Sequence, residues 1–145
     1  YLSTVKTRNP FIAYGTGING SPLHKANWSL YTYGGNLWWA KYDGSTSTQI
    51  TKGWTPSAGV WYHIAVSRAS GNLRLFIDGT QIGTTETSNT TTFKDATNSD
   101  PVRIGYQYIG NAAHYLNGYI QDVRISKNIG RYTSNFTPPT AEFEA

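Results

Sequence analysis

The sequence predicts an all-β protein whose neighbouring strands are mostly antiparallel. Short runs of β-branched and aromatic residues alternate with clusters of Gly, Asn, Asp and Ser along the 145 residues. No window of a dozen residues keeps the 3.6-residue periodicity of an amphipathic helix. Five Trp, five Phe and eleven Tyr supply enough apolar volume to fill one core.

The expected strands follow one another along the whole chain. In order, they span residues 1–8, 10–14, 27–33, 36–42, 46–51, 60–68, 72–78, 81–85, 101–107 and 115–126. Dipeptides that tolerate positive φ separate several of them, at Gly34-Gly35, Asp43-Gly44, Ser70-Gly71, Asp78-Gly79 and Gly110-Asn111. Residues 86–100 form the longest polar stretch and are expected to be a surface loop.

A hairpin is predicted over residues 60–78, with Ser70-Gly71 as a two-residue loop. This register places one apolar set on the core face: Ile64, Val66, Leu75 and Ile77. On the opposite face it pairs Ala65 with Phe76 and His63 with Asp78, a mixed surface suited to partial exposure. His63 and Asp78 form a candidate polar pair, although such pairs are common as structural features.

A second hairpin is predicted over residues 27–42, with Gly34-Gly35 as its loop. Its core face carries Trp28, Leu30, Leu37 and Trp39. The opposite face gathers an aromatic strip: Tyr31, Tyr33, Trp38 and Tyr42. Aromatic rings with polar tips stack on the apolar faces of pyranose rings, and they also seal subunit interfaces. The strip is therefore the candidate carbohydrate-binding or interface site, and both alternatives stay open.

Composition and charge exclude several classes of protein. The absence of Cys removes disulfide scaffolds, thiolate metal sites and Cys nucleophiles. No stretch approaches the roughly 20 apolar residues of a membrane helix, so no membrane insertion is expected. The formal net charge is +4, but the twelve Lys and Arg are scattered and form no run, which argues against a nucleic acid partner.

Three segments resemble a known family. They are Gly53–Ser57 (GWTPS), Trp61–Arg68 (WYHIAVSR) and Leu73–Gln81 (LRLFIDGTQ), and they resemble laminin-G-like, concanavalin A-like lectin/glucanase domains. The run Leu116–Lys127, followed by Arg131–Pro139, is similar to the end of such domains in bacteriophage tail, fibre and other virion proteins. The resemblance covers roughly residues 27–140.

The resemblance implies a two-sheet antiparallel jelly-roll-like sandwich over residues 1–140, with 141–145 as a C-terminal tail. It also implies that the first strands of the family are missing here, and an exposed edge would then favour a homo-oligomer, with a trimer as the best guess. The expected location is a virion surface or extracellular. Glycans or neighbouring virion proteins are the expected partners.

No catalytic residue is assigned. Retaining glycan hydrolases need two carboxylates about 5 to 5.5 Å apart, and no Glu-x-Asp-x-x-Glu motif occurs. No cofactor is expected, although some relatives bind calcium, and Asp95 and Asp100 are the candidate ligands for a Ca²⁺ site. The leading hypothesis is a non-catalytic, lectin-like binding module of a phage virion. The alternatives are a structural decoration or cement protein that binds no sugar and a degenerate glycan hydrolase.

Overall fold

The computed structural model describes residues 1–15, 28–42, 47–87, 89–90, 101–109 and 112–143. These residues form ten strands and contain no helix, so the all-β prediction is confirmed. The chain divides into two compact units: residues 1–60 with 91–119, and residues 61–90 with 120–145. No described segment is a helix long and apolar enough to cross a membrane.

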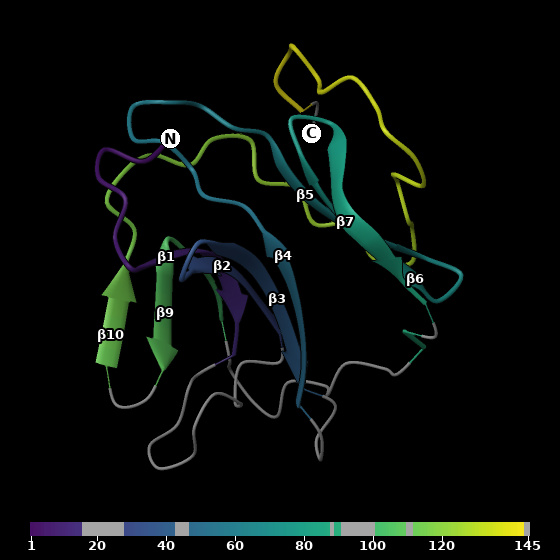
Figure 1. Ribbon diagram of the computed structural model, residues 1–145, viewed down its shortest axis with the longest axis horizontal. Coiled ribbons are helices and arrows are strands. Elements are labelled where there is room, and N and C mark those ends of the chain that lie inside the picture. The colour runs from purple at the N-terminus through teal and green to yellow at the C-terminus, as the bar shows by residue number, and fades with distance from the viewer. Residues whose placement is uncertain (16–27, 43–46, 88, 91–100, 110–111, 144–145) are drawn as a thin grey trace. The chain divides into compact units, whose positions relative to one another are not determined.

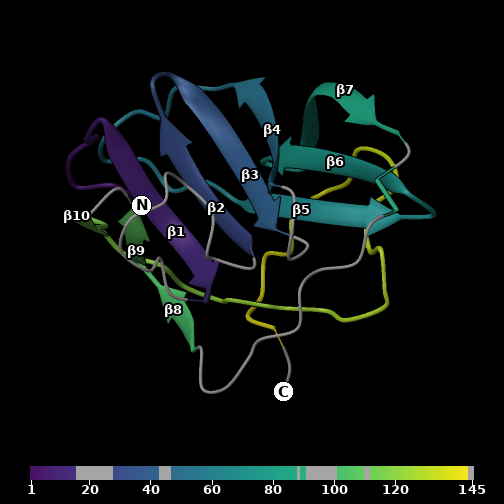
Figure 2. The same cartoon turned by 90° about the horizontal axis from the view of Figure 1, so that it is seen from below.

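The first unit contains a five-stranded antiparallel sheet in the order β4-β3-β2-β1-β8 (Figures 1 and 2; β8 is labelled in Figure 2). Its strands are β1 (Arg8–Tyr14), β2 (Trp28–Tyr33), β3 (Asn36–Tyr42), β4 (Ser47–Gly53) and β8 (Val102–Ile104). One face of the sheet is apolar and buried, and it carries Leu30, Leu37, Trp39 and Ile50. The other face is called here the outer face, and it carries the aromatic strip.

The β2–β3 hairpin has the predicted register, with Tyr31 opposite Trp38 and Leu30 opposite Trp39. Gly34 and Gly35 both have positive φ, at 58° and 75°. This is the combination that a two-residue type I′ turn requires, and its twist matches that of the flanking strands. The turn therefore sets which side chains of β2 and β3 reach the outer face.

After β8 the chain leaves the sheet and forms a separate hairpin beside β1, made of β9 (Tyr106–Ile109) and β10 (Ala112–Tyr115) (Figure 2). Gly105, with φ 68°, makes the bend and donates its N–H to the Phe11 carbonyl. The sequence analysis expected a strand at 101–107 but not one at 112–115. The hairpin adds a small third sheet to the two larger ones.

The second unit is built on an antiparallel sheet in the order β5-β6-β7, made of β5 (Ile64–Ala69), β6 (Asn72–Ile77) and β7 (Thr80–Glu86). The predicted register is confirmed, with Ile64 opposite Ile77 and Val66 opposite Leu75. Leu75 and Ile77 are buried as expected, whereas Ile64 and Val66 are only half-buried.

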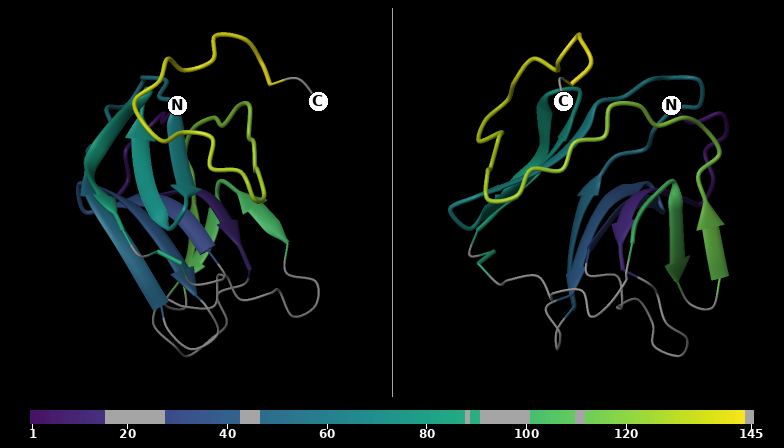
Figure 3. Two further views of the ribbon diagram at one scale, coloured as in Figure 1. Left: turned by 90° about the vertical axis from the view of Figure 1, so that its right-hand side faces the viewer. Right: turned by 180° about the vertical axis from the view of Figure 1, so that it is seen from behind.

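The opposite face of this sheet is partly exposed as expected at His63, Ala65 and Asp78, but not at Phe76. Phe76 has no exposed area, because the C-terminal segment lies against it (Figure 3). Tyr132 and Phe136 stack on each other with ring centroids 3.6 Å apart, and both rings meet Phe76 edge-on. The backbone N–H of Phe136 donates to the Gly79 carbonyl, and that of Tyr132 donates to the Ser67 hydroxyl.

Two of the expected strands are wrong. In residues 1–8 only Leu2 forms a β-bridge, to Gly118, and the strand begins at Arg8. Of the strand expected over residues 115–126, only Tyr115 lies in a strand, at the end of β10, and residues 116–126 form none. Asp122 has a φ of 52°, which is outside the β region, so a regular strand cannot continue through this residue.

Candidate functional site

The accessible part of the aromatic strip is an edge-to-face pair of rings, Tyr33 and Trp38. Tyr33 is 42% exposed and Trp38 is half-buried. Their ring centroids lie 6.2 Å apart with an interplanar angle of 62°. The indole Nε1 of Trp38 donates a 2.9 Å hydrogen bond to the Tyr33 backbone carbonyl. This bond holds the indole in one orientation, so the two rings form a preorganised surface beside the turn.

The other two members of the strip do not extend this surface. Tyr31 is only 1% exposed, because Trp38 stacks on its ring at 6.0 Å and the Arg8 guanidinium covers it. The expectation that Tyr31 offers open surface is therefore wrong. Tyr42 is half-buried and lies four residues beyond Trp38, about 13 Å along the strand, with Ala40 between them.

Arg8 is a residue of this site that the sequence alone did not point to, as is Thr51 of β4, described below. It starts β1 directly opposite Tyr33, and its guanidinium carbon lies 4.6 Å from the Tyr31 ring centroid and 4.5 Å from that of Tyr33. These distances are typical of cation–π contacts. Its Nη1 is buried and has no hydrogen-bond partner among the described residues. β1 and β2 are separated by residues 15–27 in the sequence, and no local motif predicts that the two strands pair.

Buried Asn9 fixes the start of β1 and thereby places Arg8. The Asn9 amide donates to the Lys6 carbonyl at 2.8 Å and to the Thr32 hydroxyl at 2.9 Å. Its carbonyl oxygen accepts the backbone N–H of Lys6 at 3.0 Å. Two of these bonds fix the turn before β1, and the bond to Thr32 joins it to β2, so Arg8 is held on the outer face next to Tyr33.

Polar side chains of β4 border the rings on the other side. Thr51 lies directly opposite Trp38, and Gln49 lies opposite Ala40, so both share the outer face. Thr51 is exposed and Gln49 is half-buried. The four residues Arg8, Tyr33, Trp38 and Thr51 are called here the platform. They bring together two aromatic rings, the Thr51 hydroxyl and a cation from four adjacent strands of the sheet, β1 to β4.

The sequence matches the family model of the concanavalin A-like lectin/glucanases superfamily over residues 1–129. The chain belongs to this family. The match confirms the resemblance derived from the sequence, and the antiparallel all-β structure agrees with it. No curated protein is similar enough in sequence to be matched to the chain.

Two solved structures are similar to this concanavalin A-like domain. One is the Ruminococcus gnavus IT-sialidase CBM40 bound to α2,3-sialyllactose, with 19% identity and a TM-score of 0.62. The alignment covers 81% of this chain and 66% of the CBM40 chain, so the likeness shows a shared fold. The other is an S-layer domain-containing protein (residues 221–444) from Clostridium thermocellum, with 23% identity and a TM-score of 0.38, covering 94% of this chain and 63% of that one.

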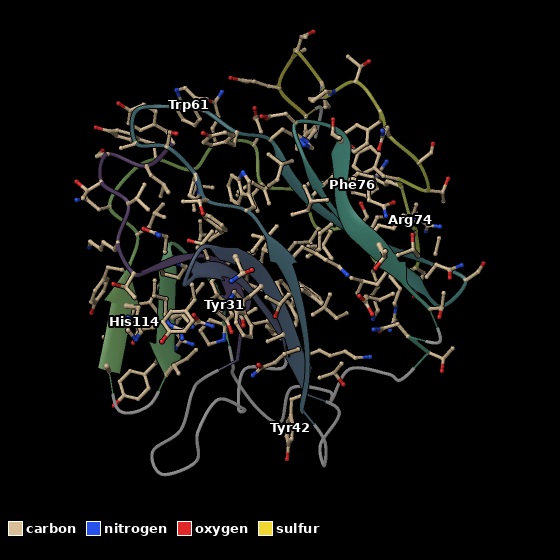
Figure 4. All side chains as sticks on the ribbon, in the orientation of Figure 1. Tyr31, Tyr42, Trp61, Arg74, Phe76 and His114 are labelled. Carbon is tan, nitrogen blue, oxygen red and sulfur yellow. The ribbon has the colours of Figure 1, made fainter. Side chains whose placement is uncertain are left out.

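The β9–β10 hairpin, which lies beside β1, carries His114 and Gln107 as cross-strand neighbours. Figure 4 labels His114 together with Tyr31 of the aromatic strip. Burial lowers the pKa of His114, and the positive charge of Arg8 lowers it further. Gln107 is 3% exposed, and its Oε1 has no hydrogen-bond partner among the described residues.

In the predicted polar pair, Asp78 bonds to the backbone of His63. Asp78 Oδ1 accepts the His63 backbone N–H at 2.7 Å, and the Asp78 N–H donates to the His63 carbonyl. The imidazole instead meets the rings of Tyr132 and Phe136 edge-on, and its buried Nδ1 lacks a partner among the described atoms. Burial lowers the pKa of His63 more than the Asp78 charge raises it. This environment is that of a packing residue in the second unit.

Acidic side chains are unevenly distributed in the domain. The described residues of the first unit include neither Asp nor Glu, so none of them can supply the carboxylate pair of a glycan hydrolase to the platform. The candidate calcium ligands Asp95 and Asp100 lie outside the described residues. Within the described part of the chain, no cluster of three or more His, Asp or Glu side chains is suited to hold a metal ion.

Proposed function

We propose that the platform binds a glycan and that the domain acts as a non-catalytic, lectin-like module. The observation that carries this proposal is the edge-to-face pair of rings beside the β2–β3 turn, the exposed Tyr33 and the half-buried Trp38, whose indole is fixed by its hydrogen bond to the Tyr33 carbonyl. A pyranose ring stacks its apolar C–H face on the indole, while Thr51 and the Tyr33 hydroxyl hydrogen-bond its rim. Because the rings are already oriented, little conformational entropy is lost on binding.

Membership of a lectin/glucanase superfamily supports this proposal, as does the shared fold of a carbohydrate-binding module that holds α2,3-sialyllactose. The resemblance of residues 116–139 to phage tail and fibre proteins further suggests a virion or other extracellular surface as the place of binding. On such a surface, a homo-oligomer would present several platforms at once and raise the avidity for a repeating glycan.

The competing proposal is a decoration or cement protein whose platform contacts another protein chain. Tyr and Trp are enriched in protein interfaces, so the exposed Tyr33 ring fits this role as well. The two proposals differ in what competes for the surface. A free oligosaccharide should compete with a glycan ligand for the platform, but it should not displace a protein partner from an interface that binds no sugar.

The test is a glycan-binding measurement on Trp38→Ala. Removing the larger ring of the pair is expected to lower the affinity for a bound glycan at least about tenfold, as for a truncated aromatic hot spot. Trp61→Ala is the matched control, because Trp61 is 53% exposed and belongs to the second unit. Equal affinity of wild type and Trp38→Ala, with both folded by circular dichroism, would place the sugar site elsewhere. Loss of oligomer in Trp38→Ala, without glycan binding by wild type, would favour the cement protein.

A further inference from the structure

We infer that the platform selects glycans that carry a carboxylate, and that Arg8 is the residue that recognises the acid. This inference rests on the proposed glycan binding and adds the class of sugar. Arg8 lies beside the exposed Tyr33 ring, and Tyr33 in turn contacts Trp38. A sugar that stacks on the two rings therefore brings substituents at its rim to the guanidinium.

None of the described residues around Arg8 neutralises its guanidinium. Its Nη1 is buried without a hydrogen-bond partner, and the described residues of the first unit contain no carboxylate. Among the described residues, the groups that contact it include the side chains of Tyr31 and Tyr33, whose rings stabilise a cation but carry no negative charge. A partly buried cation of this kind gains free energy when an anion binds, because the local dielectric constant is lower than that of water.

The charge of the whole chain is concentrated in the same unit. Residues 1–60 and 91–119 contain seven Lys and Arg against three Asp, whereas residues 61–90 and 120–145 contain five basic and five acidic residues. The entire formal net charge of +4 therefore belongs to the unit that carries the platform. This unit attracts anionic ligands from a distance, and the attraction weakens as salt is added.

A carboxylate fits the platform better than a sulfate or phosphate ester does. The planar guanidinium matches a planar carboxylate in a two-bond fork. The platform offers a single guanidinium between two rings, and no second cation contacts these rings among the described residues. The geometry thus points to uronic or sialic acids within a glycan.

The experiment compares each acid with its own methyl ester, which removes the charge and keeps the sugar. Sialyllactose, tri-galacturonate and a glucuronate-containing trisaccharide are titrated into the full chain by calorimetry, each as acid and ester. We expect at least one acid to bind about tenfold more tightly than its ester. In Arg8→Gln the affinity for the acid should fall to the affinity for the ester. Binding of the ester should persist, because the two rings of the platform remain. Persistent ester binding also shows that the variant is folded.

Two further variants make the assignment specific. Arg8→Lys keeps the charge but loses the planar fork, and it should recover only part of the preference for the acid. Lys127→Gln removes one exposed charge from the second unit and should leave the preference unchanged.

Three results overturn the inference. The first is equal binding of acid and ester in wild type, which leaves glycan binding itself intact. The second is a preference for the acid that survives in Arg8→Gln. The third is tighter binding of a sulfated glycan than of every carboxylate ligand. Failure to bind any glycan, in contrast, contradicts the proposed function as well.

Discussion

The indole of Trp38 is tied to Tyr33, the residue that precedes the turn, by a hydrogen bond from Nε1 to the Tyr33 carbonyl at 2.9 Å. The two residues belong to adjacent strands but do not oppose each other, since Tyr33 pairs with Asn36 and Trp38 pairs with Tyr31. The bond therefore runs diagonally across the hairpin. It fixes the tilt of the larger ring of the platform relative to the smaller one.

Trp38→Phe tests how much of the glycan affinity depends on the fixed orientation of the ring and how much on the presence of a ring. The variant keeps an aromatic ring but loses the Nε1 donor, whose bond contributes roughly 0.5–1.5 kcal/mol. We expect glycan affinity to fall severalfold, and less than in Trp38→Ala, because part of the stacking area remains while the ring becomes free to rotate. Parallel titrations of both variants check this order. If Trp38→Phe bound as weakly as Trp38→Ala, orientation alone would account for the contribution of the indole.

Gly79→Ala should destabilise the second unit strongly. Gly79 has a φ of 77°, and a Cβ there would collide with the backbone carbonyl of Phe136, whose N–H bonds back to the Gly79 carbonyl. The substitution must therefore displace the C-terminal segment from the sheet and expose Phe76. We expect a loss of about 3 kcal/mol or more in the free energy of unfolding, measured by urea denaturation.

Gly34→Ala is the matched control for this substitution. Gly34 also has positive φ, at 58°, but a Cβ there meets nothing within 4 Å. The control therefore reports the backbone strain alone, about 1–2 kcal/mol. Equal losses in the two variants would mean that the contact with Phe136 contributes nothing to stability.

Acidification should lower the stability of the protein through His63. Burial holds the pKa of His63 below its ordinary value of 6.5, so the unfolded chain binds the proton more readily than the folded one. The stability is therefore complete above about pH 6.5 and is lost progressively as the pH falls below this value. The lowered pKa of His114 acts in the same direction. Melting temperatures measured between pH 7.5 and pH 5 should decrease.

His63→Phe tests the origin of this pH dependence. Phenylalanine suits the edge-on contacts with Tyr132 and Phe136 and removes the buried Nδ1 that lacks a partner among the described atoms. We expect the fall in melting temperature between pH 7.5 and pH 5 to become smaller, with His114 responsible for part of the remainder. An unchanged fall in this variant would show that His63 contributes nothing to it.

The local chemistry of the sequence determined both hairpins of the predicted core. The Gly34-Gly35 and Ser70-Gly71 turns have positive φ at both positions, and a two-residue turn sets the register of the strands that it joins. That register alone determines which residues of β2 and β3 share a face: Leu37 and Trp39 lie on one face, and Trp38 lies on the other. The family was also readable, because its motifs lie in continuous stretches of the chain.

Only the tertiary structure decided which of these faces is covered. Tyr31 is buried because Arg8 of β1 covers its ring, and Phe76 is buried because Tyr132 and Phe136 return to it from the C-terminal segment. Each contact joins residues that are distant in the sequence, and alternation along a strand predicts a shared face but not what packs on it. Arg8 became part of the platform for the same reason: the pairing of Arg8 with Tyr33 is a long-range contact, and no pattern in either strand encodes its partner.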